Sequence, residues 1–276
     1  MFNKVLRAFA ALILATNILS SPALADQFHT ISVGVPPWVT GKINRLWALH
    51  INRSGEKHKI RVRLSSTSDY KTFIKRGMDH DFDLMLTPAY IAAYLWKYHH
   101  YDILSVGKYQ TDVTFIALQD ANIHDYSDIN GRSIGMPDPI AQVSLKAQQH
   151  LRSDNFIYRT HYYGQHDTVL SKVLDGTVEV GVVAERVIID FKNVIKGRLK
   201  IIHRIEAPGG GVVIASPDLP EDARNKVLAT LMDLNTAKTG FLPTWTPATQ
   251  NSGNELLKID DYAVTYIKNY MASKQH

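Results

Sequence analysis

Short apolar runs alternate with longer stretches of helical periodicity along most of the chain. Residues 31–35 and 60–64 are rich in β-branched side chains, and the second run alternates apolar with basic positions, as a half-buried strand does. Between them, Ile43, Leu46 and Trp47 recur at the spacing of one helical face. This order predicts an α/β fold in which mostly parallel sheets are flanked by helices.

The same alternation continues to the C-terminus. Residues suited to cap helices support several boundaries: Asp69 precedes one predicted helix, Thr87 stands before a proline at the next, and His166 or Asp167 opens a third. Strands are expected at 82–86, 103–106, 113–118, 133–136, 156–158, 178–183, 199–205 and 212–215, and helices at 70–76, 88–98, 142–151, 166–174, 185–191, 220–234 and 262–271.

Two stretches are interpreted as crossings between two lobes. They lie near 118–120 and 205–211, and the second contains the glycine tract Gly209-Gly210-Gly211. The predicted first lobe comprises residues 26–118 and 209–276, and the second comprises residues 119–208. Ligands of open α/β sheets bind beyond the carboxyl ends of the strands, so we expect a ligand cleft between the lobes.

The first 25 residues have the order of a secretory signal. Lys4 and Arg7 precede an apolar run at 8–18, and Ala23-Leu24-Ala25 is a small-residue cleavage pattern. The run is too short to cross a bilayer, which needs about 20 apolar residues. We therefore expect residues 1–25 to be a signal peptide and the mature protein to begin at Asp26 in the periplasm. Because the chain has no cysteine to carry a lipid, we expect a free, soluble monomer.

Composition excludes several classes of function. The formal net charge is +5, Lys4 and Arg7 contribute two of these charges, and the remaining basic residues are dispersed, which argues against nucleic acid as a partner. The absence of cysteine excludes thiol nucleophiles and thiolate metal sites. The histidine pairs His99-His100 and His161 with His166 lack the helical spacing of a zinc site. We expect no metal and no cofactor.

Four stretches carry a resemblance to a known family. The ordered set is similar to the PhnD-like periplasmic phosphate/phosphite/phosphonate-binding proteins of ABC importers, and the similarity extends over most of the mature chain. The stretches are SDYKTFIKRG at 68–77, FDLMLTPAY at 82–90, GMPDP at 135–139 and GQHDTVLSKVLDGTVEVGVV at 164–183. The resemblance implies a two-lobed type II binding protein that delivers a small-molecule ligand to an ABC permease or, in some relatives, to a sensor kinase.

The resemblance and the predicted elements together indicate ligand-binding residues. His166 matches the family's cleft histidine, Tyr70 and Tyr90 begin helices that follow strands, and Glu185 stands where relatives often place an acid. Thr87 and Trp38 follow or end strands near the expected cleft. The alternatives that do not involve a ligand differ from residue to residue, and both interpretations stay open. They are capping or a surface position for His166, contact between the lobes for Tyr70 and Tyr90, helix capping for Thr87, an interaction with the helix dipole for Glu185 and core packing for Trp38.

The sequence also departs from the family at the predicted site. After Asp138 and its proline, relatives carry a Ser/Thr-rich anion loop, whereas only Gln142 and Ser144 are polar here. A carboxylate expected near the return crossing is replaced by glycine, and Asp112 stands where an aromatic residue is expected. We therefore expect an anionic or zwitterionic ligand other than a simple phosphonate dianion, because the added carboxylate would repel a dianion.

A secreted enzyme on the same fold is the alternative of another class. An enzyme needs a nucleophile with an oriented base, or paired acids. The sequence contains no G-x-S-x-G, S-x-x-K or H-E-x-x-H motif, and the acidic cluster of Asp79, Asp81 and Asp83 has the character of a solvated loop. We therefore expect a binding protein and no catalytic residues.

Overall fold

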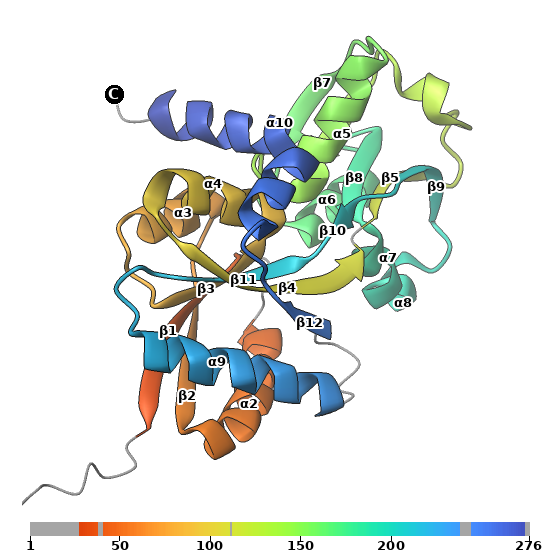
Figure 1. Cartoon of the computed structure of the whole chain (residues 1–276). Coiled ribbons are helices and arrows are strands. Elements are labelled where there is room, and N and C mark those ends of the chain that lie inside the picture. Colours follow the sequence, from red (N-terminus) through yellow and green to blue (C-terminus); the bar gives the residue numbers. More distant parts are fainter. Residues whose placement is uncertain (1–27, 38–40, 111, 238–243, 274–276) are drawn as a thin grey trace, which may run out of the picture.

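The structure is a computed structural model that describes residues 28–37, 41–110, 112–237 and 244–273 (Figure 1). The predicted signal peptide at residues 1–25 and the candidate ligand residue Trp38 lie outside the described residues. Within the described ranges, no helix is both long enough and apolar enough to span a bilayer.

The first sheet has seven strands and mixed pairing. Three neighbouring strands run parallel in the order β3-β1-β2, and β11 lies antiparallel between β3 and β4. Two short strands, β10 and β12, pair antiparallel with β4. The strands are β1 (His29–Val35), β2 (Ile60–Ser66), β3 (Leu84–Pro88), β4 (Asp102–Gln110), β10 (Pro208–Gly209), β11 (Gly211–Ala215) and β12 (Thr244–Pro247).

The second sheet has five strands in the order β7-β6-β8-β5-β9. Strand β6 is parallel to β7 and to β8, whereas β5 is antiparallel to both of its neighbours. The strands are β5 (Val113–Leu118), β6 (Ser133–Met136), β7 (Arg159–Tyr162), β8 (Val180–Ala184) and β9 (Leu199–Ile205). The predicted two-sheet α/β architecture is thus confirmed, with antiparallel strands added to a parallel centre.

Helices cover both faces of the first sheet. Figure 1 shows α2 and α9 on one face and α3, α4 and α10 on the other. The helices are α2 (Gly41–Gly55), α3 (Tyr70–Met78), α4 (Ala89–His99), α5 (Gln142–Ser153), α6 (His166–Leu174), α7 (Glu185–Asp190), α8 (Lys192–Ile195), α9 (Glu221–Leu234) and α10 (Ser252–Ser273), with short 3-10 turns η1 (Glu56–His58), η2 (Tyr126–Ile129) and η3 (Asn235–Ala237).

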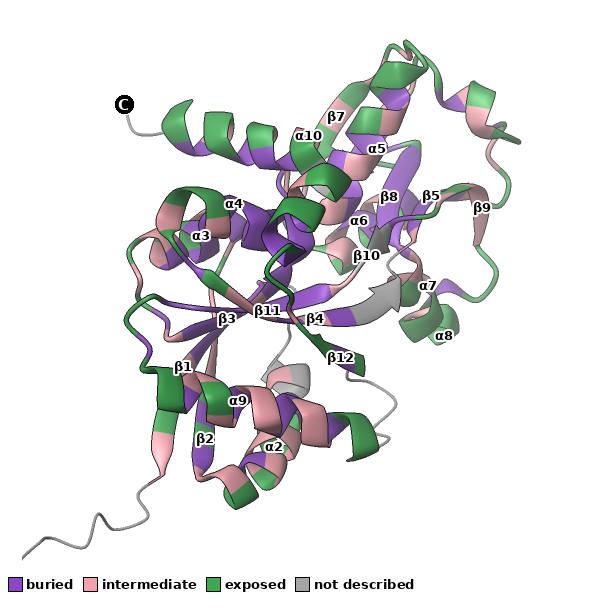
Figure 2. Cartoon of the chain, in the orientation of Figure 1, coloured by how far each residue is buried: buried purple, intermediate pink, exposed green. Residues whose placement is uncertain are grey.

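One hydrophobic cluster continues from the first sheet's helices into the second sheet. It joins Phe73 of α3 and Tyr90 of α4 to Phe115 of β5 and Met136 of β6, all of them fully or almost fully buried (Figure 2). A separate cluster lies between the first sheet and helices α2 and α9. The two lobes therefore pack directly against each other on the side of α4, α5 and α10.

The first crossing between the sheets differs from the predicted position, whereas the return crossing lies within the predicted stretch 205–211. Val113–Leu118, expected in the first lobe, form β5 and pair with β8 and β9 in the second sheet, so the first crossing precedes β5. The return crossing lies between Ile205 and Pro208, before the glycine tract. Gly210 instead lies against β4, where an added Cβ would meet the Gly107 carbonyl oxygen at 1.7 Å. Close packing, and not hinge freedom, requires that glycine.

Two further elements begin elsewhere than predicted. Phe156 and Tyr158 pack beside the core as side chains, but the strand begins after them, at Arg159. Helix α10 begins at Ser252, ten residues before the expected start. Gly253 argues against a helix on intrinsic propensity, yet an added Cβ there would lie 2.3 Å from Trp96, so α10 needs a glycine to pack on α4.

Candidate functional site

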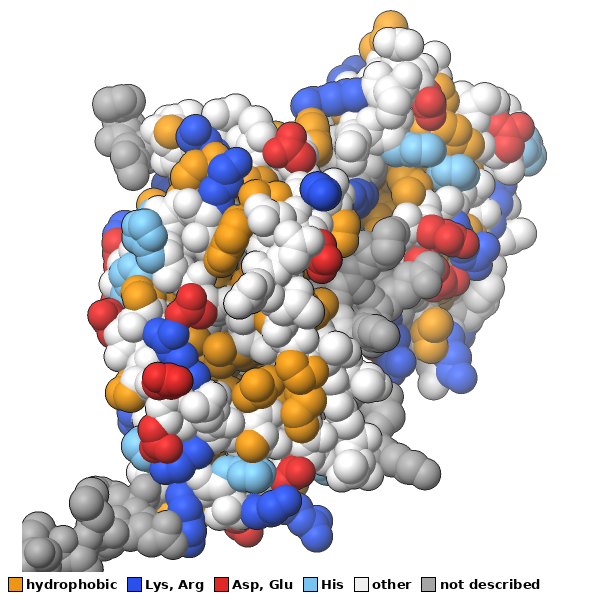
Figure 3. Space-filling view, viewed as in Figure 1, with side chains coloured by type: hydrophobic (Ala, Val, Ile, Leu, Met, Phe, Trp, Pro, Cys, Tyr) orange, Lys and Arg blue, Asp and Glu red, His pale blue; other side chains and the backbone are white. Residues whose placement is uncertain are grey.

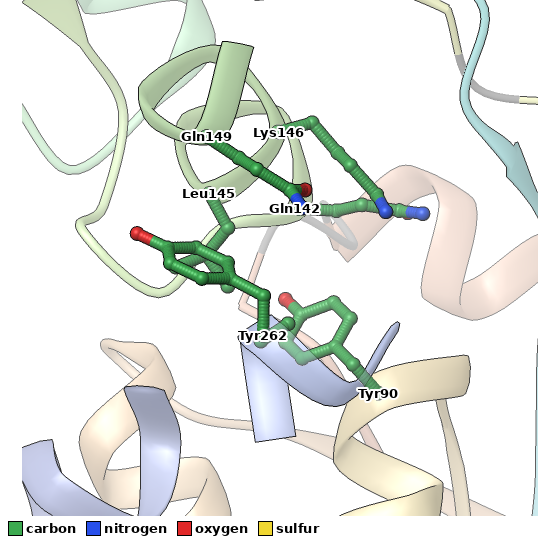
Figure 4. A pocket seen from close by; sticks show the side chains of 7 residues that line it. Tyr90, Gln142, Leu145, Lys146, Gln149 and Tyr262 are labelled. Carbon is green, nitrogen blue, oxygen red and sulfur yellow. The ribbon is translucent and has the colours of Figure 1, made fainter. Parts of the chain in front are cut away.

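A small recess lies where α4, α5 and α10 meet, between the two lobes (Figure 4). Its empty space, counted out to solvent, is about 180 Å³. The recess has no room for a water-sized sphere in this arrangement, so it can hold a solute only after the lobes move apart. The lining residues are Tyr90, Gln142, Leu145, Lys146, Gln149, Tyr262 and Ala263.

Helix α5 contributes the polar side of the recess. Gln142, Lys146 and Gln149 are spaced i, i+4 and i+7, which places them on one helical face. The N-cap position is Ala141, whose side chain cannot accept a hydrogen bond from the first-turn amides. Those amides and the helix dipole make the start of α5 favourable for negative charge.

Tyr90 forms the opposite wall and joins the lobes. It is the second residue of α4 and is fully buried. Its hydroxyl donates a hydrogen bond to the carbonyl oxygen of Ile140 at 2.6 Å, just before α5 begins. The prediction that Tyr90 belongs to the contact between the lobes agrees with this bond, and the same side chain lines the recess.

Tyr262 closes the recess from α10. Its hydroxyl oxygen accepts a hydrogen bond from Nη1 of Arg152 on α5 at 3.1 Å. The rings of Tyr262, Tyr266 and Tyr270 follow one another along α10 with centroids 6.3 Å apart in each pair. Helix α10 is therefore attached to the second lobe as well as to α4 of the first.

Three buried polar atoms near the predicted site lack hydrogen-bond partners within the described part of the chain. They are the amide nitrogen of Gln142 and the hydroxyls of Thr87 and Ser144. Such groups cost about 1–3 kcal/mol when they stay unpaired, so each is suited to a water or a ligand. Of the three residues, Gln142 lines the recess.

The capping role predicted for Thr87 is wrong. Thr87 and Pro88 both belong to β3, where they pair with Val212 and Gly211 of β11. The N-cap of α4 is Pro88, which has no hydroxyl to accept a hydrogen bond from an amide. Thr87 is instead a strand residue with 1% of its surface exposed.

Asp112, His166 and Glu185 gather at the end of β8. The Ala184 amide donates to Nδ1 of His166 at 3.3 Å, and the Glu185 amide donates to the Asp112 carbonyl oxygen at 3.0 Å. The Glu185 carboxylate forms an ion pair with Nε of Arg204 at 3.0 Å. The Glu185 carboxylate of this second group is therefore balanced by Arg204, and none of the three residues lines the recess.

The expectation that His166 caps α6 or supplies a positive charge is not met. The N-cap residue is Gln165. Burial lowers the pKa of His166 to about 4, so the imidazole is neutral at pH 7. Because Nδ1 accepts the amide hydrogen of Ala184, the ring proton lies on Nε2, and the side chain can donate one hydrogen bond as a neutral group.

Tyr70 and Asp138 make a further contact between the lobes. Tyr70 opens α3 and is buried, and its backbone amide approaches the Asp138 carboxylate. Burial raises the pKa of Asp138, the amides of Ile140 and Tyr70 oppose that rise, and the charge of Asp69 adds to it. Asp138 belongs to the family-like stretch at 135–139, and the sequence alone did not indicate this contact.

The structure brings only part of the predicted site together. Tyr90 and Gln142 share the recess, and Asp112, His166 and Glu185 form the second group. Ser144 is fully buried on α5. Lys146, Gln149 and Tyr262 were missed. The helical spacing from Gln142 indicates the first two, whereas Tyr262 depends on the path of α10. No three His, Asp or Glu side chains within the described ranges are grouped to hold a metal ion.

Comparisons with known proteins identify similar folds and a family. The family model "ABC transporter, phosphonate, periplasmic substrate-binding protein" matches residues 34–261. No curated protein sequence matches the chain. PhnD1 from Prochlorococcus marinus, solved with methylphosphonate, has a TM-score of 0.69 at 12% identity, over 84% of this chain and 97% of that one.

Two other solved structures have the same fold. XAC2383 from Xanthomonas citri, bound to ATP, has a TM-score of 0.68 at 14% identity, over 87% of this chain and 98% of its own. A binding protein component of an ABC phosphonate transporter from Pseudomonas aeruginosa, PA3383, has a TM-score of 0.67 at 14% identity, over 86% of this chain and 87% of its own.

Proposed function

Since the chain belongs to the periplasmic substrate-binding proteins of ABC phosphonate transporters, we propose that it captures a small anionic or zwitterionic solute between its lobes for an inner-membrane permease. The observation that carries the proposal is the recess at the start of α5. It combines Tyr90 and Gln142 from the predicted site with Lys146, and the amide nitrogen of Gln142 lacks a partner among the described residues.

The chemistry of the recess supports an oxyanion. First-turn amides of α5 and the Gln142 amide are hydrogen-bond donors, and the dipole of α5 favours a negative charge at its start. Two proteins of the same fold were solved with methylphosphonate and with ATP, which both carry such oxygens. We infer that the solute presents an oxyanion to the start of α5.

A simple phosphonate dianion is not the solute that we favour. Neutral His166 supplies no positive charge at pH 7, and the Glu185 carboxylate at the end of β8 is paired with Arg204. A solute with one negative charge, or with a balancing ammonium group, needs less positive charge from the protein than a dianion does. The surface charge does not indicate the charge of the solute, because charges of both signs are interspersed on the face in Figure 3.

We propose that binding is coupled to closure of the two lobes. The first lobe would comprise the described residues up to β4 and from β10 onward, and the second would run from β5 to β9. Opening would break the hydrogen bond from Tyr90 to Ile140 and rotate the lobes about the crossings before β5 and after β9. Small-angle scattering should give a smaller radius of gyration with ligand than without.

A thermal-shift screen tests the proposed function. The panel contains phosphate, phosphite, phosphonates, sulfonates, carboxylates and amino compounds, and binding raises the melting temperature by mass action. We expect at least one compound to stabilise the protein and to be recovered unchanged. Turnover of the compound would favour the alternative of a secreted enzyme. If the compound activates a sensor kinase through this protein and is not taken up by the cell, the partner is a sensor kinase and not a permease.

A further inference from the structure

We propose that the outer face of α2 binds an anionic lipid surface and so keeps the protein close to a membrane. The face consists of Arg45, Leu46, Leu49 and Arg53, and we call it the α2 patch. The inference goes beyond the proposed function, because it does not depend on which solute the lobes bind. It assigns a partner to the first lobe, at a place apart from the recess.

The α2 patch is a solvent-exposed stripe along one helix. Arg45, Leu49 and Arg53 are spaced i, i+4 and i+8, and Leu46 lies beside them on the same side. All four side chains are exposed, Leu46 to 40% and Leu49 to 62%. Trp47 faces the other way and packs into the apolar cluster between α2 and the first sheet. Leu46, which was expected on the buried face with Trp47, is therefore on the outer face.

The segment from α2 to β2 is strongly basic. Residues 41–66 contain seven Lys or Arg and one acid, Glu56, so their net charge of +6 exceeds the +5 of the whole chain. The expectation that the basic residues are dispersed is wrong for this segment. Lys57 pairs with Asp233 of α9. Within the described ranges, however, no acidic side chain pairs with four of the basic residues, which are Arg45, Arg53, Arg61 and Arg63.

Strand β2 extends the positive charge beyond the α2 patch. It is the edge strand of the first sheet and packs against α2. Arg61 and Arg63 are exposed and alternate with the buried residues Ile60 and Val62. Figure 1 shows α2 and β2 together at the end of the first lobe that is remote from the second lobe. The cations of both elements would therefore turn this end of the protein toward a negatively charged surface.

Two properties of the α2 patch favour lipid over another partner. Exposed leucines are common when they occur singly, but here two of them lie between two arginines that have no acidic partner among the described residues. On a membrane, such leucines enter the apolar boundary while the long arginine side chains reach the lipid phosphates. Nucleic acids instead stack their bases on aromatic side chains, which the α2 patch lacks.

Co-sedimentation of the exported protein with lipid vesicles tests the proposal. One set of vesicles contains phosphatidylglycerol in phosphatidylcholine, and the other contains phosphatidylcholine alone. We expect the protein to bind the anionic vesicles at least about tenfold more tightly at low ionic strength. Salt at about 0.5 M should release it, because the Debye length is then below about 5 Å.

Two double variants separate the charged and the apolar contributions. Arg45→Gln with Arg53→Gln should weaken binding to the anionic vesicles about tenfold or more, since each basic side chain near the surface contributes about fivefold. Leu46→Gln with Leu49→Gln should weaken it severalfold, because less apolar surface enters the lipid. Both should bind the solute as the wild type does.

Lys192→Gln with Arg198→Gln is the matched control, because it removes the same charge from exposed positions of the second lobe. It should change vesicle binding by less than about twofold, and equal melting temperatures would show that all variants are folded. Equal binding to both kinds of vesicle, binding to neither, or an equal loss in the control would overturn the α2 patch as a lipid site. These outcomes leave the proposed function intact, because solute affinity is measured separately.

Discussion

Two hollows of this protein differ in what lines them. The recess between the lobes has glutamines, a lysine and two tyrosines on its walls. The second hollow lies inside the first lobe, between the sheet and helices α2 and α9, and measures about 550 Å³ counted out to solvent. Its lining, which includes Val33, Leu84, Val213 and Leu231, is apolar apart from Thr230 and the indole nitrogen of Trp245.

The two hollows differ in place and in the number of polar side chains. The Gln142 amide nitrogen in the recess and Nε1 of Trp245 in the larger hollow both lack partners among the described residues, so an unpaired polar atom alone does not distinguish the two. The hydroxyl of Thr230 in the larger hollow already donates to the carbonyl of Lys226 at 2.8 Å. We assign recognition to the recess because it lies between the lobes and has polar side chains on its α5 wall, and we treat the larger hollow as a packing defect that affects stability.

The largest expected effect is on stability, from Leu231→Ala in the apolar hollow. Leu231 is 6% exposed, and its truncation enlarges an existing void, so the free energy of unfolding should fall by about 2–5 kcal/mol. Denaturant unfolding measures this change, and calorimetry should find ligand affinity unchanged at a temperature where the variant is folded. A tenfold loss of ligand affinity in the folded variant would contradict the claim that the apolar hollow affects stability and not ligand binding.

The next effect is a pH dependence that belongs to neither hollow. The pKa of His166 falls from its usual 6.5 to about 4 on folding, so between those values the unfolded chain binds a proton that the folded chain does not. The stability is therefore complete above about pH 6.5 and is lost as the pH falls toward 4, by about 3 kcal/mol. Unfolding curves from pH 7 to pH 4 measure the loss.

His166→Gln should reduce that pH dependence, because glutamine retains an acceptor for the Ala184 amide and does not titrate. Some slope should remain, because burial also lowers the pKa values of His99 and His203. His124→Gln, at an exposed position, is the matched control and should keep the wild-type slope. If both variants have the wild-type slope, a different group causes the acid sensitivity. Affinity measurements for the recess should therefore be made above pH 6.5.

A smaller effect is expected from Tyr90→Phe. The change removes the hydrogen bond to Ile140 and leaves a buried carbonyl without that donor, which should cost about 1 kcal/mol of stability. It should also increase the radius of gyration of the ligand-free protein, since the bond joins the lobes. Tyr98→Phe, at a partly exposed position on the same helix, should change neither quantity. An unchanged radius of gyration in the Tyr90 variant would show that this hydrogen bond does not hold the lobes together.

The smallest expected effect compares filling of the two hollows. Val213→Ile adds one methylene group to the apolar hollow and should stabilise the protein by about 0.5–1 kcal/mol without changing affinity. Ala263→Leu, which fills the recess, should weaken ligand binding instead. Melting temperature and calorimetry on both variants measure the contrast. Equal affinity of the two variants would contradict the assignment of recognition to the recess.

The sequence predicted the elements best where buried apolar runs have polar borders. The strands at Ser133–Met136 and Leu199–Ile205 match the prediction at both ends. Errors arose where a local signal had a tertiary cause. Thr87 before a proline resembled a cap, but the pairing of β3 with β11 continues through both residues. The glycine tract resembled a hinge, but Gly210 is fixed by its approach to β4.

The candidate site was predicted less well than the fold. Tyr90 and Gln142 could be identified because each lies at a helix start after a strand. Tyr262 could not, because its place in the recess depends on α10 lying across α4 and α5. The neutral state of His166 was equally hidden, because its cause is burial of the imidazole in the folded chain.

A crystal structure with the tightest ligand of the thermal-shift screen tests the central claim most directly. We predict ligand density between the lobes, within hydrogen-bond distance of the Gln142 amide nitrogen and beside Tyr90. Density in the apolar hollow beside Trp245 and Leu231, or at the surface away from α5, would contradict it.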